Sequence, residues 1–130
     1  MTRYLVLITA LALAGCVSAP PQQSASTAPA TSPVSLSSDQ EARVKQVVTA
    51  SLKDPDSARF GPMQATYSLQ TGTTICGMIN ARNSFGGYTG DKPYLVVISD
   101  SGEAALAALG GVERDTAVAL RACQRLGMAL

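Results

Sequence analysis

Apolar and polar residues divide the chain into three zones. Residues 4–14 form a nearly unbroken apolar run that follows Arg3. Residues 17–35 consist almost entirely of Ala, Ser, Thr, Pro and Gln and carry no charge. From about residue 36 to residue 130, apolar residues recur at the spacings of helices and strands. This last zone is long enough for one hydrophobic core and too short for two, so we expect a single domain over residues 37–130.

The periodic zone predicts a helix, then strands, then helix again. Apolar positions predict an amphipathic helix over residues 38–52, which begins with a capping pattern of Ser38 and Glu41 and ends before Pro55. Stretches of β-branched and aromatic residues predict strands at residues 63–70, 73–81 and 93–99. Residues 104–109 and 112–127 read as two helical pieces separated by a pair of glycines. The predicted fold class is α+β: a small three-stranded, mainly antiparallel sheet flanked by an N-terminal and a C-terminal helix.

The N-terminal zone has the layout of an export signal. A basic start followed by a short apolar run is typical of a secretory signal peptide, and this run is too short to span a bilayer. The residues Leu13-Ala14-Gly15-Cys16 resemble the lipobox of bacterial lipoproteins. That resemblance implies transfer of a diacylglyceryl group to the Cys16 thiol, cleavage before Cys16 and acylation of the new amine. We therefore expect a signal peptide at residues 1–15, and a lipidated cysteine with a disordered tether at residues 16–36. The alternative is an ordinary signal peptide with a coincidental cysteine.

A lipid on Cys16 would hold the domain on a membrane of the cell envelope, facing the periplasm. Position 17 is Val17, whereas an aspartate there is the usual inner-membrane retention signal in enteric-type bacteria, so the outer membrane is favoured over the inner membrane. Of the ten basic residues only Arg3 lies in the signal, which leaves nine against nine acidic residues, with the two signs interleaved. This balance gives no indication of a nucleic-acid partner.

Two cysteines, Cys76 and Cys123, remain once Cys16 is lipidated. In an oxidising compartment two remaining thiols usually form a disulfide, and this one would tie the C-terminal helix to the sheet. An unpaired buried cysteine and a redox site are the alternatives. The sequence has no Cys-x-x-Cys motif to favour the redox site.

Patterns typical of catalysis are scarce in this sequence. The chain contains no histidine, which removes Ser-His-Asp and Cys-His catalysis and the commonest metal ligand. Neighbouring carboxylates lie in predicted turns or at helix starts, where helix capping explains them. We therefore expect no enzyme activity, no cofactor and no metal.

The most unusual stretch is residues 75–90, where an apolar strand passes into a polar segment and a glycine-rich loop that carries Tyr88. Together with residues 52–60, it resembles a family of small proteobacterial exported proteins, many of them lipoproteins. Members pair a DPxSAxF corner with a CGxxNAxNSFGGYxG segment. No activity is assigned to this family, so the resemblance implies a shared domain and a disulfide and transfers no function.

Two interpretations of this loop are open. In the first, the asparagines fasten a wide turn and Tyr88 packs as a lid. In the second, the loop contacts an envelope protein or a glycan through Asn80, Arg82, Asn83 and Tyr88. The sequence thus favours a membrane-anchored envelope lipoprotein that is a non-enzymatic binding or structural module. The alternative is an inhibitor of, or an accessory to, a cell-wall hydrolase.

Overall fold

The computed structural model of the protein describes residues 31–130. The expected signal peptide, Cys16 and most of the expected tether lie outside the described residues. The elements, in chain order, are β1 (Ser32–Val34), α1 (Ser38–Thr49), the short 3-10 helix η1 (Pro55–Ser57), β2 (Arg59–Ser68), β3 (Gly72–Asn80), β4 (Lys92–Ile98), β5 (Ala104–Leu109) and α2 (Glu113–Arg125). Within this part of the chain, no helix is both long and apolar enough to cross a membrane.

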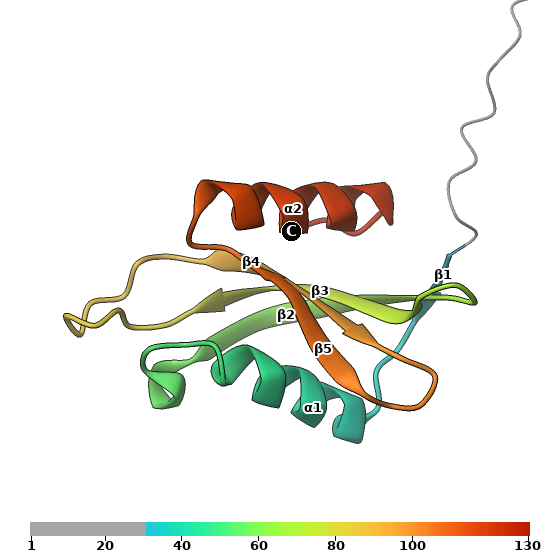
Figure 1. Ribbon diagram of the computed structural model, residues 1–130, viewed down its shortest axis with the longest axis horizontal. Helices are drawn as coiled ribbons and strands as arrows, with labels where there is room; N and C mark the ends of the chain where they lie inside the picture. The colour runs from blue at the N-terminus through green and yellow to red at the C-terminus, as the bar shows by residue number, and fades with distance from the viewer. Residues whose placement is uncertain (1–30) are drawn as a thin grey trace, which may run out of the picture.

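The five strands form one antiparallel sheet in the order β1-β2-β3-β4-β5, so each strand pairs with its neighbour in the sequence. The two long helices cover opposite faces of this sheet (Figure 1). The helix α1 lies below it and α2 lies above it in that view. The predicted α+β class with two flanking helices is confirmed, whereas the predicted count of three strands is wrong.

The larger core lies between the sheet and α1. Val44 and Val48 of α1 are fully buried against β3 and β4. They follow each other at i and i+4, so they share the helix face that meets the sheet. The helix begins at Ser37, whose side chain accepts from the Gln40 backbone while the Gln40 side chain accepts in return from the Ser37 backbone. The cap is therefore one residue earlier than the predicted Ser38 and Glu41 pattern.

The smaller core lies between the sheet and α2. It contains the disulfide between Cys76 of β3 and Cys123 of α2, whose Cα atoms are 6.0 Å apart, and both cysteines are buried. The predicted pairing is thus confirmed, and it ties the C-terminal helix to the sheet as expected. Gly127 ends the helix with a φ of 75°, and the Met128 backbone then donates back to Cys123, which brings Met128 into the same core.

Two segments differ from the sequence-based expectation. Residues 104–109 were expected to be helical and instead form β5, which is paired with β4. Ala favours helix, but six residues are too few for a stable helix, and pairing with a buried strand outweighs the local propensity. At the N-terminal end, Ser32–Val34 pair with Tyr67–Ala65 of β2, so the sheet begins inside the range expected to be a disordered tether.

Candidate functional site

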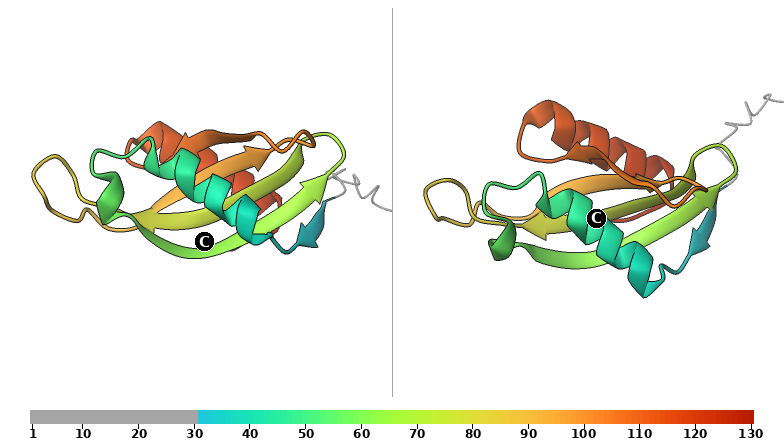
Figure 2. Two further views of the ribbon diagram at one scale, coloured as in Figure 1. Left: turned by 90° about the horizontal axis from the view of Figure 1, so that it is seen from below. Right: turned by 60° about the horizontal axis from the view of Figure 1, so that its bottom comes forward.

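The loop between β3 and β4, residues 81–91, projects beyond the sheet at one end of the molecule (Figures 1 and 2). The turn between β2 and β3 lies at the opposite end in both figures. This loop carries most of the residues that the sequence singled out. Its geometry therefore bears on whether these side chains hold a turn together or are free to contact a partner.

Asn83 fastens the tip of the loop. Its side-chain oxygen accepts hydrogen bonds from the backbone N–H groups of Phe85, at 2.9 Å, and Gly87, at 3.1 Å. Two backbone bonds, from Asn83 to Gly87 and from Gly86 to Asn83, close the same turn. Gly86 has a φ of 80°, which a residue with a side chain rarely adopts. For Asn83, the interpretation as a turn-fastening residue fits the observed contacts.

Phe85 lies at this fastened tip, and its side chain is 97% exposed. A phenylalanine on a mobile loop would fold back onto nearby apolar surface, because burial of its ring is favourable by about 2 kcal/mol. Here the hydrogen bonds to Asn83 fix the backbone on both sides of Phe85. The loop thus presents a large apolar ring to solvent from an ordered backbone.

Ser57 connects the base of the loop to the corner that precedes β2. Its hydroxyl accepts from the Arg82 backbone at 2.9 Å and donates to the Asp54 backbone carbonyl at 2.7 Å. Its own carbonyl accepts from the Tyr88 hydroxyl at 3.2 Å. The corner residues Pro55–Ser57 form the short helix η1, where the Asp54 side chain makes no capping bond. The corner before β2 and the β3–β4 loop are therefore in direct contact.

Two arginine side chains lie over the Tyr88 ring. The Cζ atom of Arg59 lies 4.3 Å from the ring centroid, and that of Arg82 lies 5.4 Å from it. Both distances are within the range of a cation–π interaction. Arg82 and Tyr88 also face each other across a short antiparallel bridge. We name the surface formed by Arg59, Arg82, Phe85 and Tyr88 the loop platform.

Asn80 is placed differently from the other predicted site residues. Its side-chain oxygen is buried and has no hydrogen-bond partner among residues 31–130. It lies at the end of β3 opposite Arg59. Of the four predicted contact residues, the structure thus brings Arg82 and Tyr88 to the platform, assigns Asn83 to the turn and leaves Asn80 half-buried with its side-chain oxygen enclosed.

Sequence reasoning missed Arg59, Phe85 and Ser57 as parts of this site. Ser57 and Arg59 lie at the start of β2, where no contact residue was predicted. The sequence carries no signal that places this corner beside the β3–β4 loop, because that contact depends on the pairing of β2 with β3. Phe85 stands inside the second motif, between Asn83 and the glycines, and was not weighed as a contact residue.

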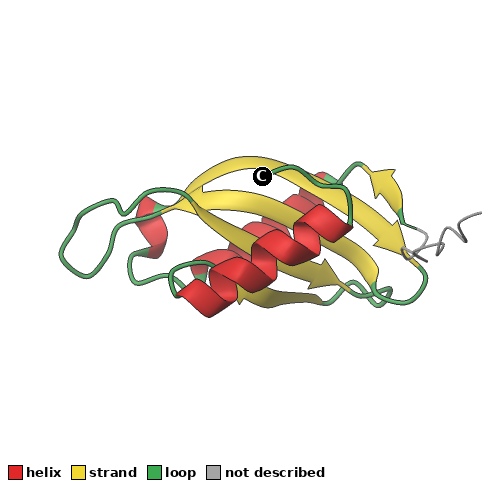
Figure 3. Ribbon diagram, turned by 90° about the horizontal axis from the view of Figure 1, so that it is seen from above, coloured by secondary structure: helices red, strands yellow, loops and turns green. Residues whose placement is uncertain are grey.

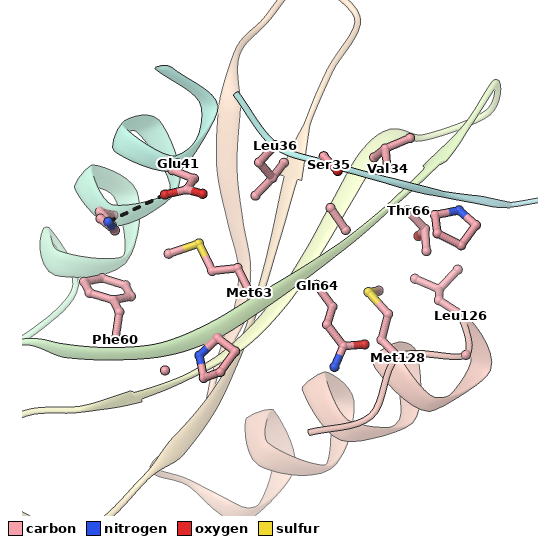
Figure 4. Close-up of a pocket in the computed structure, with 16 residues that line it drawn as sticks. Val34, Ser35, Leu36, Glu41, Phe60, Met63, Gln64, Thr66, Leu126 and Met128 are labelled. Carbon is pink, nitrogen blue, oxygen red and sulfur yellow. Dashed lines mark ion pairs between the residues drawn. The ribbon is translucent and has the colours of Figure 1, made fainter. Parts of the chain in front are cut away.

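A groove of about 640 Å³ is the second candidate site. It follows the outer edge of β2, where β1 covers only the segment Ala65–Tyr67. Figure 4 shows Phe60 and Met63 on the side of α1, and Gln64 beside Met128 on the other side. The Gln64 side chain is hydrogen-bonded to the backbone of Ala129, so the C-terminal segment already occupies that part of β2.

The groove offers no reactive side chain, and the strand edge that it exposes is protected from further pairing. Its charged residues are Glu41 and Lys45, which form an ion pair at 3.8 Å on the exposed surface of α1. A bulge between Phe60 and Met63 contains Pro62, which has no N–H to donate. Bulges and prolines are the usual means by which a protein protects a free edge from further pairing. We therefore regard the loop platform as the stronger candidate.

One titratable side chain of residues 31–130 has a clearly shifted acidity, and it is not part of the loop platform. This part of the chain contains no group of three or more Cys, Asp or Glu side chains placed to hold a metal ion. The strongest shift in acidity is at Tyr94, where burial, with a smaller contribution from Glu41, raises the pKa to about 12. Tyr94 lies in the core beneath α1, away from the loop platform.

Comparisons with protein-family models, with curated proteins and with solved structures find no significant match to this chain.

Proposed function

We propose that the protein is a lipid-anchored module of the cell envelope that binds another envelope protein through the loop platform and catalyses no reaction. The observation that carries this proposal is Phe85, a ring that is 97% exposed on a backbone fixed by Asn83. An ordered, exposed aromatic side chain on a projecting loop contributes nothing to its own fold. It is suited to fill a pocket on a partner.

The residue types on the platform support a protein partner. Aromatic residues and arginine are enriched at the energetically important centres of protein interfaces. Because the loop is already ordered, little conformational entropy remains to be lost on binding. The loop is also narrow and projecting, so it fits a concave partner such as the open cleft of a cell-wall hydrolase.

The charges on the platform specify the partner further. Within residues 31–130 the structure contains a single ion pair, Glu41 with Lys45, so neither Arg59 nor Arg82 has a carboxylate partner there. The Tyr88 ring holds both guanidinium groups in place. Guanidinium groups bind carboxylates through paired hydrogen bonds, so we expect acidic side chains around the pocket that receives Phe85.

The anchor rests on the lipobox resemblance at Cys16. The mass of the protein extracted from membranes tests it, because the mature chain should begin at Cys16 and carry two or three acyl chains. A chain that retains residues 1–15, or that begins elsewhere without acyl groups, would refute the lipid anchor. Replacement of Cys16 by Ser should release the protein from its membrane.

The platform is tested by replacement of Phe85 with Ser in the full-length protein. If Phe85 fills a pocket, its loss should lower recovery of the envelope partner at least 10-fold, as for a central interface residue. Leu69→Ser is the matched control, because Leu69 is 85% exposed in the turn at the opposite end of the molecule. Equal recovery with both variants would contradict the proposal, and melting temperatures should show that neither variant is unfolded.

A further inference from the structure

The outward face of α2 carries a row of arginines. Arg114, Arg121 and Arg125 are exposed, and with Val118 they recur at i, i+4, i+7 and i+11. At 3.6 residues per turn, all four fall within a sector of about 60°. Cys123, which is bonded to the sheet, lies on the opposite side of the helix. We name Arg114, Arg121 and Arg125 the α2 arginine row.

The fold does not account for this row. None of the three guanidinium groups has an ion-pair or hydrogen-bond partner in residues 31–130. The ion pair there joins Glu41 and Lys45, and the arginine whose side chain donates a hydrogen bond is Arg43. Arg121 and Arg125 are like charges at i and i+4, which disfavours the helix. Arg114 lies in the first turn, where the positive end of the helix dipole repels a cation. Arg125 alone has a favourable place, in the last turn.

The surface between the arginines is shallow and mostly apolar, with Glu113 at its N-terminal end. The arginines border a hollow on the outer side of α2 whose floor includes Ala117, Val118 and Ala122. Val118 is 46% exposed there, and Val112, just before the helix, is 60% exposed. Arginine side chains can lay their apolar stems on such a floor while the charged ends reach outward.

The shape of the row fits a flat anionic surface. The row extends along the helix for about 16 Å at 1.5 Å per residue. Seen from above, α2 lies in front of the sheet and forms the outermost layer on that side (Figure 3). A straight row on the outermost layer can reach several phosphates of a plane at once, whereas a compact ligand would meet at most the neighbouring pair Arg121 and Arg125.

We propose that the α2 arginine row binds the phosphate groups of anionic phospholipid in a bilayer, with Val118 between the headgroups. The row supplies positive charge that the fold leaves unpaired, and arginine pairs with phosphate through two hydrogen bonds. The inference does not rest on the loop platform. It needs only that the protein is held near a membrane, as the lipid on Cys16 would do.

The contact would fix the orientation of the domain on the bilayer. With α2 against the bilayer, α1 faces away from it and the sheet lies between them (Figure 1). The β3–β4 loop then projects along the bilayer rather than away from it. The loop platform would thus meet partners that stand in, or lie on, the same membrane.

Labelling of arginines with phenylglyoxal tests the proposal on the full protein as extracted from membranes. The protein is reconstituted in vesicles of phosphatidylcholine alone or of phosphatidylcholine with phosphatidylglycerol, and each arginine is followed by mass spectrometry. The three arginines of the row should react several-fold more slowly with phosphatidylglycerol present, and high salt should restore their reaction. Arg43 of α1, on the opposite face, should react equally in both vesicles and serves as the internal reference.

Two double variants separate this surface from the loop platform. In the double variant Arg121→Gln with Arg125→Gln, the affinity of α2 for the anionic bilayer should fall roughly 25-fold. Arg114 should therefore lose its protection from labelling. In Arg59→Gln with Arg82→Gln, which removes the same charge, protection of the row should persist even if partner binding is lost. Equal reaction of the row in both vesicle types would overturn the proposal. Protection that is equally strong in phosphatidylcholine alone would also overturn it, since it would indicate a protein contact.

Discussion

At the scale of single residues, the core is fitted around the Tyr94 ring. Tyr94 is fully buried, packs edge-on against Phe60 with ring centroids 6.0 Å apart, and lies opposite Gly77 of the neighbouring strand. A Cβ atom on Gly77 would lie 2.3 Å from the Tyr94 hydroxyl oxygen and 2.6 Å from the adjacent ring carbon. The sequence could indicate that both residues belong to strands. It could not show that one makes room for the other, because that depends on strand register.

Replacement of Gly77 by Ala should therefore destabilise the domain by about 1–3 kcal/mol, the usual range for added volume in a packed core. For a domain of this size, each kcal/mol lowers the melting temperature by roughly 4–8 °C. Gly87→Ala is the matched control, since its nearest neighbour would be the Asn83 side chain at 3.9 Å. Calorimetry of both variants checks the prediction, and similar melting temperatures for the two would contradict the close fit.

The Tyr94 hydroxyl should make stability fall in alkaline solution. It is buried without a hydrogen-bond partner in residues 31–130, and burial raises its pKa to about 12, whereas a tyrosine in an unfolded chain ionises near pH 10. Between these values the unfolded chain releases a proton that the folded chain keeps, so the free energy of unfolding decreases as pH rises above about 10.

Urea unfolding at about pH 8 and about pH 11 measures this effect. The native protein should lose more stability between the two conditions than Tyr94→Phe does. Near neutral pH, Tyr94→Phe should be as stable as the native protein or slightly more so, because it removes an unpaired buried hydroxyl. An equal alkaline loss in both proteins would show that other groups cause it.

At the scale of elements, periodicity and boundary residues predicted α1, α2 and three of the strands to within a few residues. The segment Ala104–Leu109 was misread, because its alanines favour helix locally while its pairing with β4 arises only in the folded sheet. Small side chains here have a packing role, since Ala108 lies against Ala119 and Cys123 in the core beneath α2. The strand β1 was also missed, because three residues in a Ser- and Pro-rich segment carry no periodic signal.

The disulfide should account for a large part of the stability of the α2 layer. The smaller core contains few large side chains, and Cys76 and Cys123 are 47 residues apart in the chain. Closing a loop of that length stabilises a fold by about 4 kcal/mol in the chain-entropy model.

Replacement of both cysteines by Ala should therefore lower the free energy of unfolding by about 2–4 kcal/mol, measured by urea denaturation. Reduction of the native protein should produce a loss of the same size and should leave the double variant unchanged. A double variant as stable as the oxidised native protein would show that packing alone holds α2 on the sheet.

At the scale of the whole molecule, binding features lie at two places that the sequence only partly revealed. The sequence singled out the β3–β4 loop, but it could not show that Ser57 joins this loop to the corner before β2. It also gave no sign of the α2 arginine row, because acidic and basic residues interleave along the chain. The helix gathers Arg114, Arg121 and Arg125 on one side, and the covered sheet face directs that side outward.

The loop platform is tested most directly by photo-crosslinking in living cells. A photoreactive phenylalanine analogue is placed at Phe85 in one full-length protein and at Leu69 in another, since these are two of the most exposed large apolar side chains and lie at opposite ends of the molecule. We predict a discrete crosslinked envelope protein from position 85 and none from position 69, with the adduct reduced when Arg59 and Arg82 are both replaced by Gln. No discrete adduct at position 85, or the same adducts from both positions, would contradict the proposed role of the loop.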